Sequence, residues 1–213
     1  MADNRVSSRP PLWSGADPLI LASKSASRRA LLAAAGLPAK SVAVDIDERA
    51  LEDRFLGGGG SLERLAAELA QAKALAASAL HPEAYCLGAD QTLTLEDRLL
   101  HKPRDLTEAA HSLAALAGRT HRLTSAFCIA RSGAILGIEQ DTAELHMRIL
   151  DGRAIAQYLD LAGPDVISSV GVYQLEGLGL HLFDRIDGDH ATILGIPMLK
   201  LLAWLRGQDL ISL

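Results

Sequence analysis

Hydrophobic side chains recur every three to four residues in five stretches of the chain, the spacing of helices with one buried face. The clearest stretch is 61–80, whose apolar stripe consists of Leu62, Leu65, Leu69, Ala72, Ala76 and Leu80. Ser25 and Thr107 are suited to cap two further helices, which we expect to end near Gly36 and Gly118. The five predicted helices span 25–35, 61–80, 107–117, 151–161 and 196–206.

Other stretches are continuously apolar or alternate with a period of two, which indicates strands. A short buried strand is expected at 18–22, and an alternating one at 41–46. Another apolar strand, 85–89, ends at Asp90, and 92–95 and 99–100 form a hairpin. Two long strands, 123–129 and 135–149, are joined by a turn at Arg131-Ser132-Gly133. The Gly-rich segment 170–186 also resembles a strand.

The interleaving of helices and strands predicts an α/β protein with a mixed sheet. We expect a frayed extension over 1–17 and one domain over 18–213, because no segment is long enough to be a linker between domains. The charged segment after Ile46 ends in four glycines, Gly57 to Gly60, and is interpreted as a flexible connection.

The net charge of −5 and the lack of Lys- and Arg-rich runs argue against a protein that coats nucleic acid. No stretch approaches the ~18 apolar residues of a membrane span, and the first residues do not resemble a signal peptide. Cys86 and Cys128 lie in apolar runs and are interpreted as buried thiols. These features predict a cytoplasmic protein without a membrane or nucleic-acid partner.

The loop from Ser23 to Arg29 is a candidate anion site. It supplies three hydroxyls, from Ser23, Ser25 and Ser27, and the two positive charges of Arg28 and Arg29. It lies where a strand turns into a helix, and the free N–H groups of a helix N-terminus attract anions. The alternative is an ordinary helix cap with two solvated arginines, and the loop alone does not decide between them.

Lys73 falls near the middle of the apolar stripe of the 61–80 helix. A lysine there either extends to the edge of the buried surface or meets an anion. Asp90 is suited to be a metal ligand or a general base, or it opens a turn. Glu48 belongs to an acidic cluster that on its own is typical of a solvated face, and Lys102 is equally compatible with a turn.

Together these residues combine phosphate-binding cations with carboxylates at predicted strand ends. The sequence contains no Walker A, HExxH, GxSxG or GxGxxG motif, and no covalent nucleophile stands out. The combination favours metal-assisted hydrolysis of a phosphoanhydride.

A series of short motifs runs through the chain in a fixed order: Leu21–Arg29, Val44–Glu48, Ala72-Lys73, Gly88–Gln91, His101–Pro103, Gly118–His121, Gly171–Gly177, Phe183–Gly188 and Gly195–Pro197. In these motifs and their order, the chain resembles the Maf family of nucleoside triphosphate pyrophosphatases over nearly its whole length, from Leu19 to Leu205. The resemblance implies a fold like that of the inosine triphosphate pyrophosphatases, with an elongated mixed sheet flanked by helices and two lobes around a cleft.

The resemblance also implies a reaction and a site. A nucleoside triphosphate would be split between its α and β phosphates with Mg²⁺ or Mn²⁺. Asp90 matches the proton acceptor and Glu48 an essential carboxylate, and these two would hold the metal. The residues that match the phosphate-binding set are Ser23, Ser25, Arg28, Arg29, Lys73 and Lys102.

Three positions bear on the base. Gln91 and Glu176 resemble the branch that acts on 7-methyl-GTP, whereas the branch that acts on dTTP and UTP more often has Thr and Gln there. Ser27 departs from both branches, in which Trp or Arg is usual. We therefore predict a preference for 7-methyl-GTP, with the Glu176 carboxylate accepting guanine N–H groups.

Two alternatives accompany this prediction. The first is a non-catalytic nucleotide-binding regulator of cell division, disfavoured because Asp90, Glu48 and Lys73 are all present. The second concerns assembly: Leu202 and Trp204 either complete the core or form the face of a homodimer, and we expect them in the core.

Overall fold

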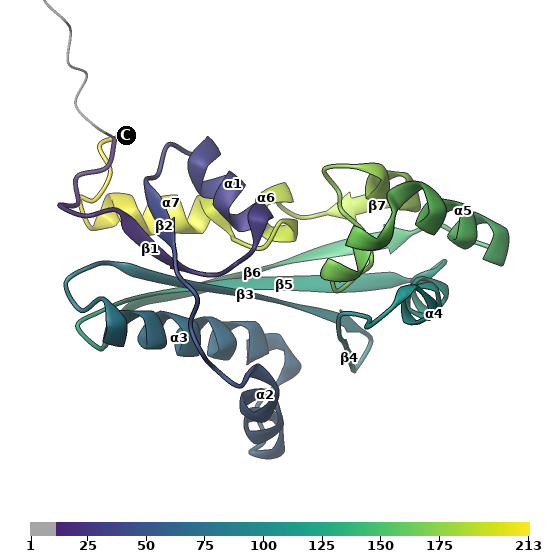
Figure 1. Cartoon of the computed structure of the whole chain (residues 1–213), viewed down its shortest axis with the longest axis horizontal. Helices are drawn as coiled ribbons and strands as arrows, with labels where there is room; N and C mark the ends of the chain where they lie inside the picture. Colours follow the sequence, from purple (N-terminus) through teal and green to yellow (C-terminus); the bar gives the residue numbers. More distant parts are fainter. Residues whose placement is uncertain (1–11) are drawn as a thin grey trace, which may run out of the picture.

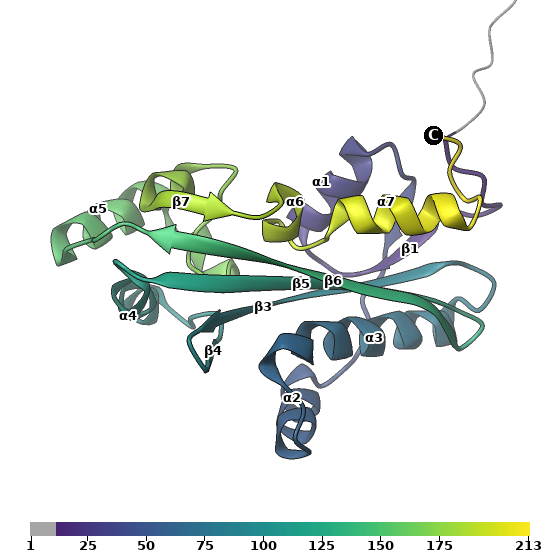
Figure 2. The same cartoon turned by 180° about the vertical axis from the view of Figure 1, so that it is seen from behind.

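The computed structural model describes residues 12–213, which form one elongated seven-stranded sheet with helices on both faces (Figures 1 and 2). The main strand order is β2-β1-β3-β5-β6-β7, and β4 pairs with β3. β1 is parallel to β2 and β3, and the remaining pairs are antiparallel, so the predicted mixed α/β sheet is confirmed. The strands are β1 Leu19–Ala22, β2 Ala39–Ser41, β3 Cys86–Leu95, β4 Arg98–Leu100, β5 Thr120–Arg131, β6 Ala134–Met147 and β7 Phe183–Asp187.

Helices cover the two faces unequally. In Figures 1 and 2, α1, α6 and α7 lie over one face at one end of the sheet, α3 crosses the opposite face, and α4 and α5 lie at the other end. The helices are α1 Ala26–Ala34, α2 Glu48–Gly57, α3 Leu62–Leu80, α4 Leu106–Leu116, α5 Gly152–Ala162, α6 His190–Ile193 and α7 Met198–Gly207, with short 3₁₀ turns η1 Pro164–Ser168 and η2 Leu178–Leu182. Among residues 12–213, no helix is both long and apolar enough to cross a lipid bilayer.

Several predicted elements are confirmed by their caps and turns. Ser25 caps α1 by accepting the N–H of Arg28, and Asp151 caps α5 by accepting that of Ala154. The hairpin of β5 and β6 turns at Ser132 and Gly133, both with positive φ. α4, however, is capped by Asp105 and not by Thr107, because the aspartate carboxylate reaches the N–H of Glu108.

The prediction of a strand at 41–46 is wrong. β2 ends at Ser41. Val42 still donates its N–H to the Leu21 carbonyl of β1 at 2.9 Å, but residues 43–46 belong to no strand. The side chains of Val42, Val44 and Ile46 are partly buried, whereas residues 43, 45 and 47 are exposed. The alternation therefore reflects burial of one side of an extended segment, a pattern that does not require a neighbouring strand.

The expected flexible connection after Ile46 is also wrong, because it contains α2. The Asp47 carboxylate caps this helix by accepting the N–H of Ala50 at 2.9 Å, and Gly57 is its last residue. α2 has no buried residues, so hydrophobic periodicity could not reveal it. Capping and charged side chains support it instead.

Asp90 does not end its strand. β3 continues to Leu95 because β5 pairs with it residue by residue from Cys86 to Thr94. The strand that ends at this level is β1, whose last partner on β3 is Gly88. Asp90 therefore lies beside the carboxyl end of β1, where the sheet opens.

The predictions for the Gly-rich segment 170–186 and for the N-terminal extension are corrected in part. The Gly-rich segment 170–186 is mostly irregular, with only β7 and the turn η2 formed. Of the expected extension over 1–17, residues 1–11 lie outside the described part of the chain. Residues 12–17 are held to the domain by Trp13, whereas Ser14, Ala16 and Asp17 are exposed. Trp13 is buried and bridges to Ile211, and its indole stands edge-on to the ring of Tyr85.

The two largest clusters of the core lie at opposite ends of the sheet. One surrounds Leu93, Leu113 and Leu145, and the other surrounds Leu19, Phe127 and Leu201. Leu202 and Trp204 pack against the second cluster, as expected. Cys86 and Cys128 are buried and unbridged, and burial raises the pKa of their thiols to about 11 and about 12.

Gly88 allows α3 to touch the sheet. A Cβ atom at Gly88 would lie 2.1 Å from the carbonyl oxygen of Ala70 and 2.5 Å from the backbone nitrogen of Ala74. Small side chains on the facing stripe of α3 continue this close contact, namely Ala66, Ala70 and Ala74. The helix backbone therefore lies directly against β3.

We predict that Gly88→Ala lowers the free energy of unfolding by about 3 kcal/mol or more, because backbone atoms must move to accommodate the methyl group. Gly152→Ala is the control, since a Cβ there meets no atom within 4 Å, and we expect a change within about 1 kcal/mol. Urea unfolding of both variants checks the prediction. Equal stability of the two would contradict the close helix–strand contact.

Candidate active site

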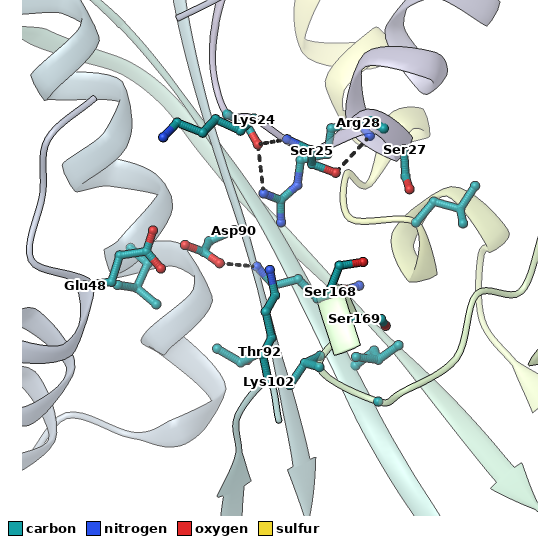
Figure 3. A pocket seen from close by; sticks show the side chains of 18 of the residues that line it. Lys24, Ser25, Ser27, Arg28, Glu48, Asp90, Thr92, Lys102, Ser168 and Ser169 are labelled. Carbon is teal, nitrogen blue, oxygen red and sulfur yellow. Dashed lines mark hydrogen bonds between the residues drawn. The ribbon is translucent and has the colours of Figure 1, made fainter. Parts of the chain in front are cut away.

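A cleft of about 890 Å³ lies between the two ends of the sheet. Its walls come from the loop after β1, from α2 and α3, from β3, and from the segments around 99–102 and 168–176. Of the residues proposed from the sequence, the cleft contains Ser23, Ser25, Ser27, Arg28, Glu48, Lys73, Asp90, Gln91, Lys102 and Glu176. Figure 3 shows this pocket, with Glu48 and Ser27 on opposite sides of it.

The centre of the site is a lysine held between two carboxylates. Lys73 Nζ donates to Asp90 Oδ2, and it lies 2.8 Å from Glu48 Oε1. The Lys73 and Asp90 side chains are only 10% and 11% exposed, so this pair is largely removed from water, whereas Glu48 is 55% exposed. The expectation that Lys73 meets an anion is thus the correct alternative. The Asp90 carboxylate also accepts the N–H of Gln91 at 2.6 Å.

Glu48 reaches this lysine from the first turn of α2. A second contact holds that helix in place: Arg49 Nη1 lies 2.7 Å from His101 Nε2 and 3.0 Å from Glu52 Oε1. Burial lowers the pKa of His101, while the charge of Glu52 acts in the opposite direction. This cluster ties α2 to the segment after β4 that carries Lys102.

The loop from Ser23 to Arg28 caps α1 and also places its arginine in the cleft wall, so Arg28 is not the solvated side chain of an ordinary helix cap. Ser25 Oγ caps α1, and Ser23 Oγ accepts from the Ser25 N–H and from Arg28 Nη1, each at 3.2 Å. Arg28 Nε donates to the Gly195 carbonyl at 3.0 Å. Burial lowers the pKa of the Arg28 guanidinium, and the charges of Asp90 and Glu48 raise it. The arginine is therefore fixed in the cleft wall near both carboxylates.

Arg29 is not brought into the cleft. Its side chain is exposed and donates to the Lys24 carbonyl at 2.8 Å. On the helix that begins at Ala26, each residue is turned about 100° from the one before it. Ser27 and Arg28 face the cleft, and the next step turns Arg29 away from it. Lys24, which the sequence analysis did not propose as a ligand, lines the cleft instead.

Ser27 and Glu176 meet across the cleft although they are 149 residues apart. Ser27 Oγ donates to Glu176 Oε1 at 3.2 Å. Gln91 lies in the same wall, but its amide nitrogen is within 3.1 Å of Ser125 Oγ and the carbonyls of Thr192 and Ile193. Gln91 therefore supports the α6 segment through this nitrogen.

Thr92 is a cleft residue that the sequence analysis missed. It is 5% exposed, and its hydroxyl has no hydrogen-bond partner within residues 12–213. It lies two residues beyond Asp90 on β3 and thus on the same face of the sheet. The period-two rule could have identified it had the strand been extended past Asp90. Ser168, Ser169 and Tyr173 also line the cleft from the segment before Glu176.

The carboxylates of Glu48 and Asp90 offer hard oxygen ligands that suit Mg²⁺ or Mn²⁺. Within the described part of the chain, no group of three or more His, Cys, Asp or Glu side chains is arranged to hold a metal ion. Two carboxylates are nevertheless enough for Mg²⁺ when substrate phosphates and water complete its shell. The donor set therefore fits a metal that arrives with a phosphorylated ligand.

We predict that Lys73→Met lowers the free energy of unfolding by about 3–5 kcal/mol, because it leaves Asp90 buried without its cation. Lys102→Met is the control: it removes an exposed lysine, and we expect a change within about 0.5 kcal/mol. Urea unfolding measures both. Equal losses in the two variants would contradict the buried ion pair, and adding Asp90→Leu to Lys73→Met should recover stability.

Comparison with known proteins identifies the family to which this chain belongs. The model of the family described as Maf-like protein matches residues 18–208. A nucleoside triphosphate pyrophosphatase from Rhodopseudomonas palustris (strain HaA2) is 50% identical over 201 residues, which cover 94% of this chain and 98% of that protein. A 7-methyl-GTP pyrophosphatase from Rhizobium etli is 49% identical over 188 residues, covering 88% and 94%. One of the same description from Mesorhizobium japonicum is 47% identical with the same coverage. The chain belongs to the Maf family.

Proposed function

We propose that this protein cleaves the bond between the α and β phosphates of a nucleoside triphosphate, with 7-methyl-GTP favoured over dTTP and UTP. The products are a nucleoside monophosphate and pyrophosphate. The chain is a nucleoside triphosphate pyrophosphatase and thus a hydrolase of acid anhydrides, as relatives that match almost its full length indicate. The observation that supports this chemistry is the Glu48–Lys73–Asp90 cluster inside a cleft with further cations.

The cations of the cleft suit a triphosphate chain. Arg28 offers a planar fork of donors, and Lys24, Lys73 and Lys102 offer point charges around the same space. Figure 3 shows Lys24, Arg28 and Lys102 around Asp90. A polyanion bound here would offset the mutual repulsion of these cations, and their fixed positions would stabilise charge that develops during cleavage.

Asp90 is the proposed general base. It lies at the centre of the site, and its carboxylate is oriented by Lys73 and by the Gln91 N–H. Cleavage takes up one water: one product oxygen comes from that water, and Asp90 accepts the proton that is released. Glu48 and Asp90 would hold Mg²⁺ or Mn²⁺, which would supply charge neutralisation at the phosphates.

We predict that Asp90→Asn lowers kcat by about 10²–10⁴-fold, because the amide cannot accept the proton. Asp97→Asn, in the exposed turn between β3 and β4, should keep full activity. The measurement is pyrophosphate release from a panel of standard and modified triphosphates with Mn²⁺. If the wild-type protein releases none from any triphosphate, the enzyme proposal fails, and full activity of Asp90→Asn would remove Asp90 as the base.

The preference for 7-methyl-GTP rests on Glu176. Its exposed carboxylate lies at the cleft with Ser27 as its only hydrogen-bond donor among the described residues. Guanine presents two adjacent donors, N1–H and the N2 amino group, to a carboxylate, whereas uracil and thymine present a single N3–H between two carbonyl oxygens. The positive charge of the 7-methyl ring also favours an anionic partner. Two relatives that are 49% and 47% identical are described as 7-methyl-GTP pyrophosphatases, which supports this proposal.

Glu176→Gln should reduce the kcat/KM ratio of 7-methyl-GTP over UTP by roughly ten- to hundred-fold, because a hydrogen bond to a charged group contributes about 1.5–3 kcal/mol. The ratio is measured by steady-state kinetics with both nucleotides. Glu139→Gln, on the exposed part of β6, is the matched control and should leave the ratio unchanged. An unchanged ratio in Glu176→Gln would refute the assigned role.

A further inference from the structure

The segment that carries Glu176 has no regular structure between η1 and η2, yet its inner side is well packed. Val172, Tyr173 and Leu175 are buried, and they belong to the core cluster around Leu113 and Leu145. Tyr173 and Leu175 also reach the cleft, and the less buried Ser169, Gln174 and Glu176 line it beside them. We call residues 168–177 the base loop.

The base loop contains strained backbone. Val172 has a φ of +62°, which is rare for a β-branched residue, because its Cβ crowds the carbonyl oxygen. Such a conformation persists only where surrounding contacts impose it, and strain of this kind concentrates at ligand sites. The contacts that impose it here come from α5 and β5.

The first contact is a hydrogen bond from α5. The buried Tyr158 hydroxyl donates to the carbonyl of Val172 at 3.0 Å, so it satisfies the backbone of the strained residue itself. Burial raises the pKa of Tyr158 to about 12, which keeps this hydroxyl a donor at neutral pH. Tyr158 does not line the cleft.

The second contact comes from β5. His121 Nε2 lies 2.6 Å from the Tyr173 hydroxyl, and both side chains are buried against the ring of Phe183. Tyr173 also covers Gly171, where a Cβ atom would lie 2.3 Å from the tyrosine ring. Burial lowers the pKa of His121 to about 4, so the pair is neutral at pH 7. Like Tyr158, His121 lies outside the cleft.

We propose that Tyr158 and His121 are positioning residues for nucleotide binding: their hydrogen bonds impose the strained form of the base loop that presents Glu176 to the cleft opposite Ser27. Removal of either hydrogen bond lets Val172 relax toward negative φ, and the residues that follow it turn with it. Glu176 then loses its fixed place although neither changed side chain touches the nucleotide. This inference rests on the proposed function.

Tyr158→Phe is the sharpest test, because it removes one hydroxyl and keeps the ring. We expect KM for the favoured triphosphate to rise roughly tenfold, which corresponds to about 1.4 kcal/mol, while kcat stays within about twofold. The ratio of 7-methyl-GTP to UTP turnover should fall toward that of Glu176→Gln. The double variant Tyr158→Phe/Glu176→Gln should show little further loss of the ratio, because both changes remove the same interaction.

Two further variants separate positioning from general stability. His121→Gln keeps a hydrogen-bonding group near Tyr173 and should raise KM less than His121→Leu does. Tyr85→Phe is the control, since Tyr85 packs on Trp13 and Arg131 outside the cleft, and it should leave KM and the ratio unchanged. If Tyr158→Phe and His121→Leu lower only the melting temperature, with KM and the ratio unchanged, the positioning role is refuted.

Binding of a non-hydrolysable α,β-imido analogue of 7-methyl-GTP, measured by calorimetry, keeps this test independent of turnover. A weaker Kd in Tyr158→Phe but not in Tyr85→Phe supports the positioning role even if the wild-type protein hydrolyses nothing. Equal Kd values in the wild type and Tyr158→Phe overturn the positioning role while leaving the hydrolase proposal intact.

Discussion

The contact between α3 and β3 at Gly88 is the constraint on which the site depends. Because Gly88 has no side chain, the helix backbone lies against the strand, and Lys73, which lies between Ala70 and Ala74 on this helix, is brought to Asp90 two residues along the strand. A larger residue at Gly88 would push the helix outward and separate the two charges in a place from which water is largely excluded. The same position of α3 brings Lys73 within reach of Glu48 on α2, so one backbone contact assembles the central cluster.

The cleft exists because the sheet is long and its two ends are covered by different groups of helices. β1 ends beside Gly88, whereas β3 and β5 continue to the other end, and the opening beside Asp90 follows from this difference in strand length. The side chains proposed to bind the phosphates come mainly from α1, α3 and the segment after β4. The side chains proposed to contact the base come from the far end through the base loop. Strain at Val172 and the buried tyrosine and histidine contacts show that this loop is specified by its surroundings and not by local propensity.

Elements that are specified by local capping and hydrophobic periodicity could be predicted from the sequence, whereas elements that depend on strand pairing or lack buried side chains could not. The buried stripe of α3, the Ser25 cap and the helix over 151–161 depend on local signals, so their predictions were confirmed. α2 was missed because it buries no side chain, and the end of β3 was misplaced because pairing with β5 extends the strand past a charged residue that normally favours a turn. Arg29 was grouped with Arg28 by type, although the helix turns the two in different directions.

The sequence by itself determined the fold class, the family to which the chain belongs and the residue types available for phosphate chemistry, because these depend on periodicity, capping and ordered motifs within short segments. Tertiary structure alone decided that Lys73 joins Glu48 to Asp90 and that Ser27 faces Glu176. It also decided that the Thr92 hydroxyl lies in the cleft without a hydrogen-bond partner among residues 12–213. Those contacts join residues far apart in the chain, and packing of helices on the sheet sets their distances. Hydrophobic and polar patterns within one segment do not predict distances between segments.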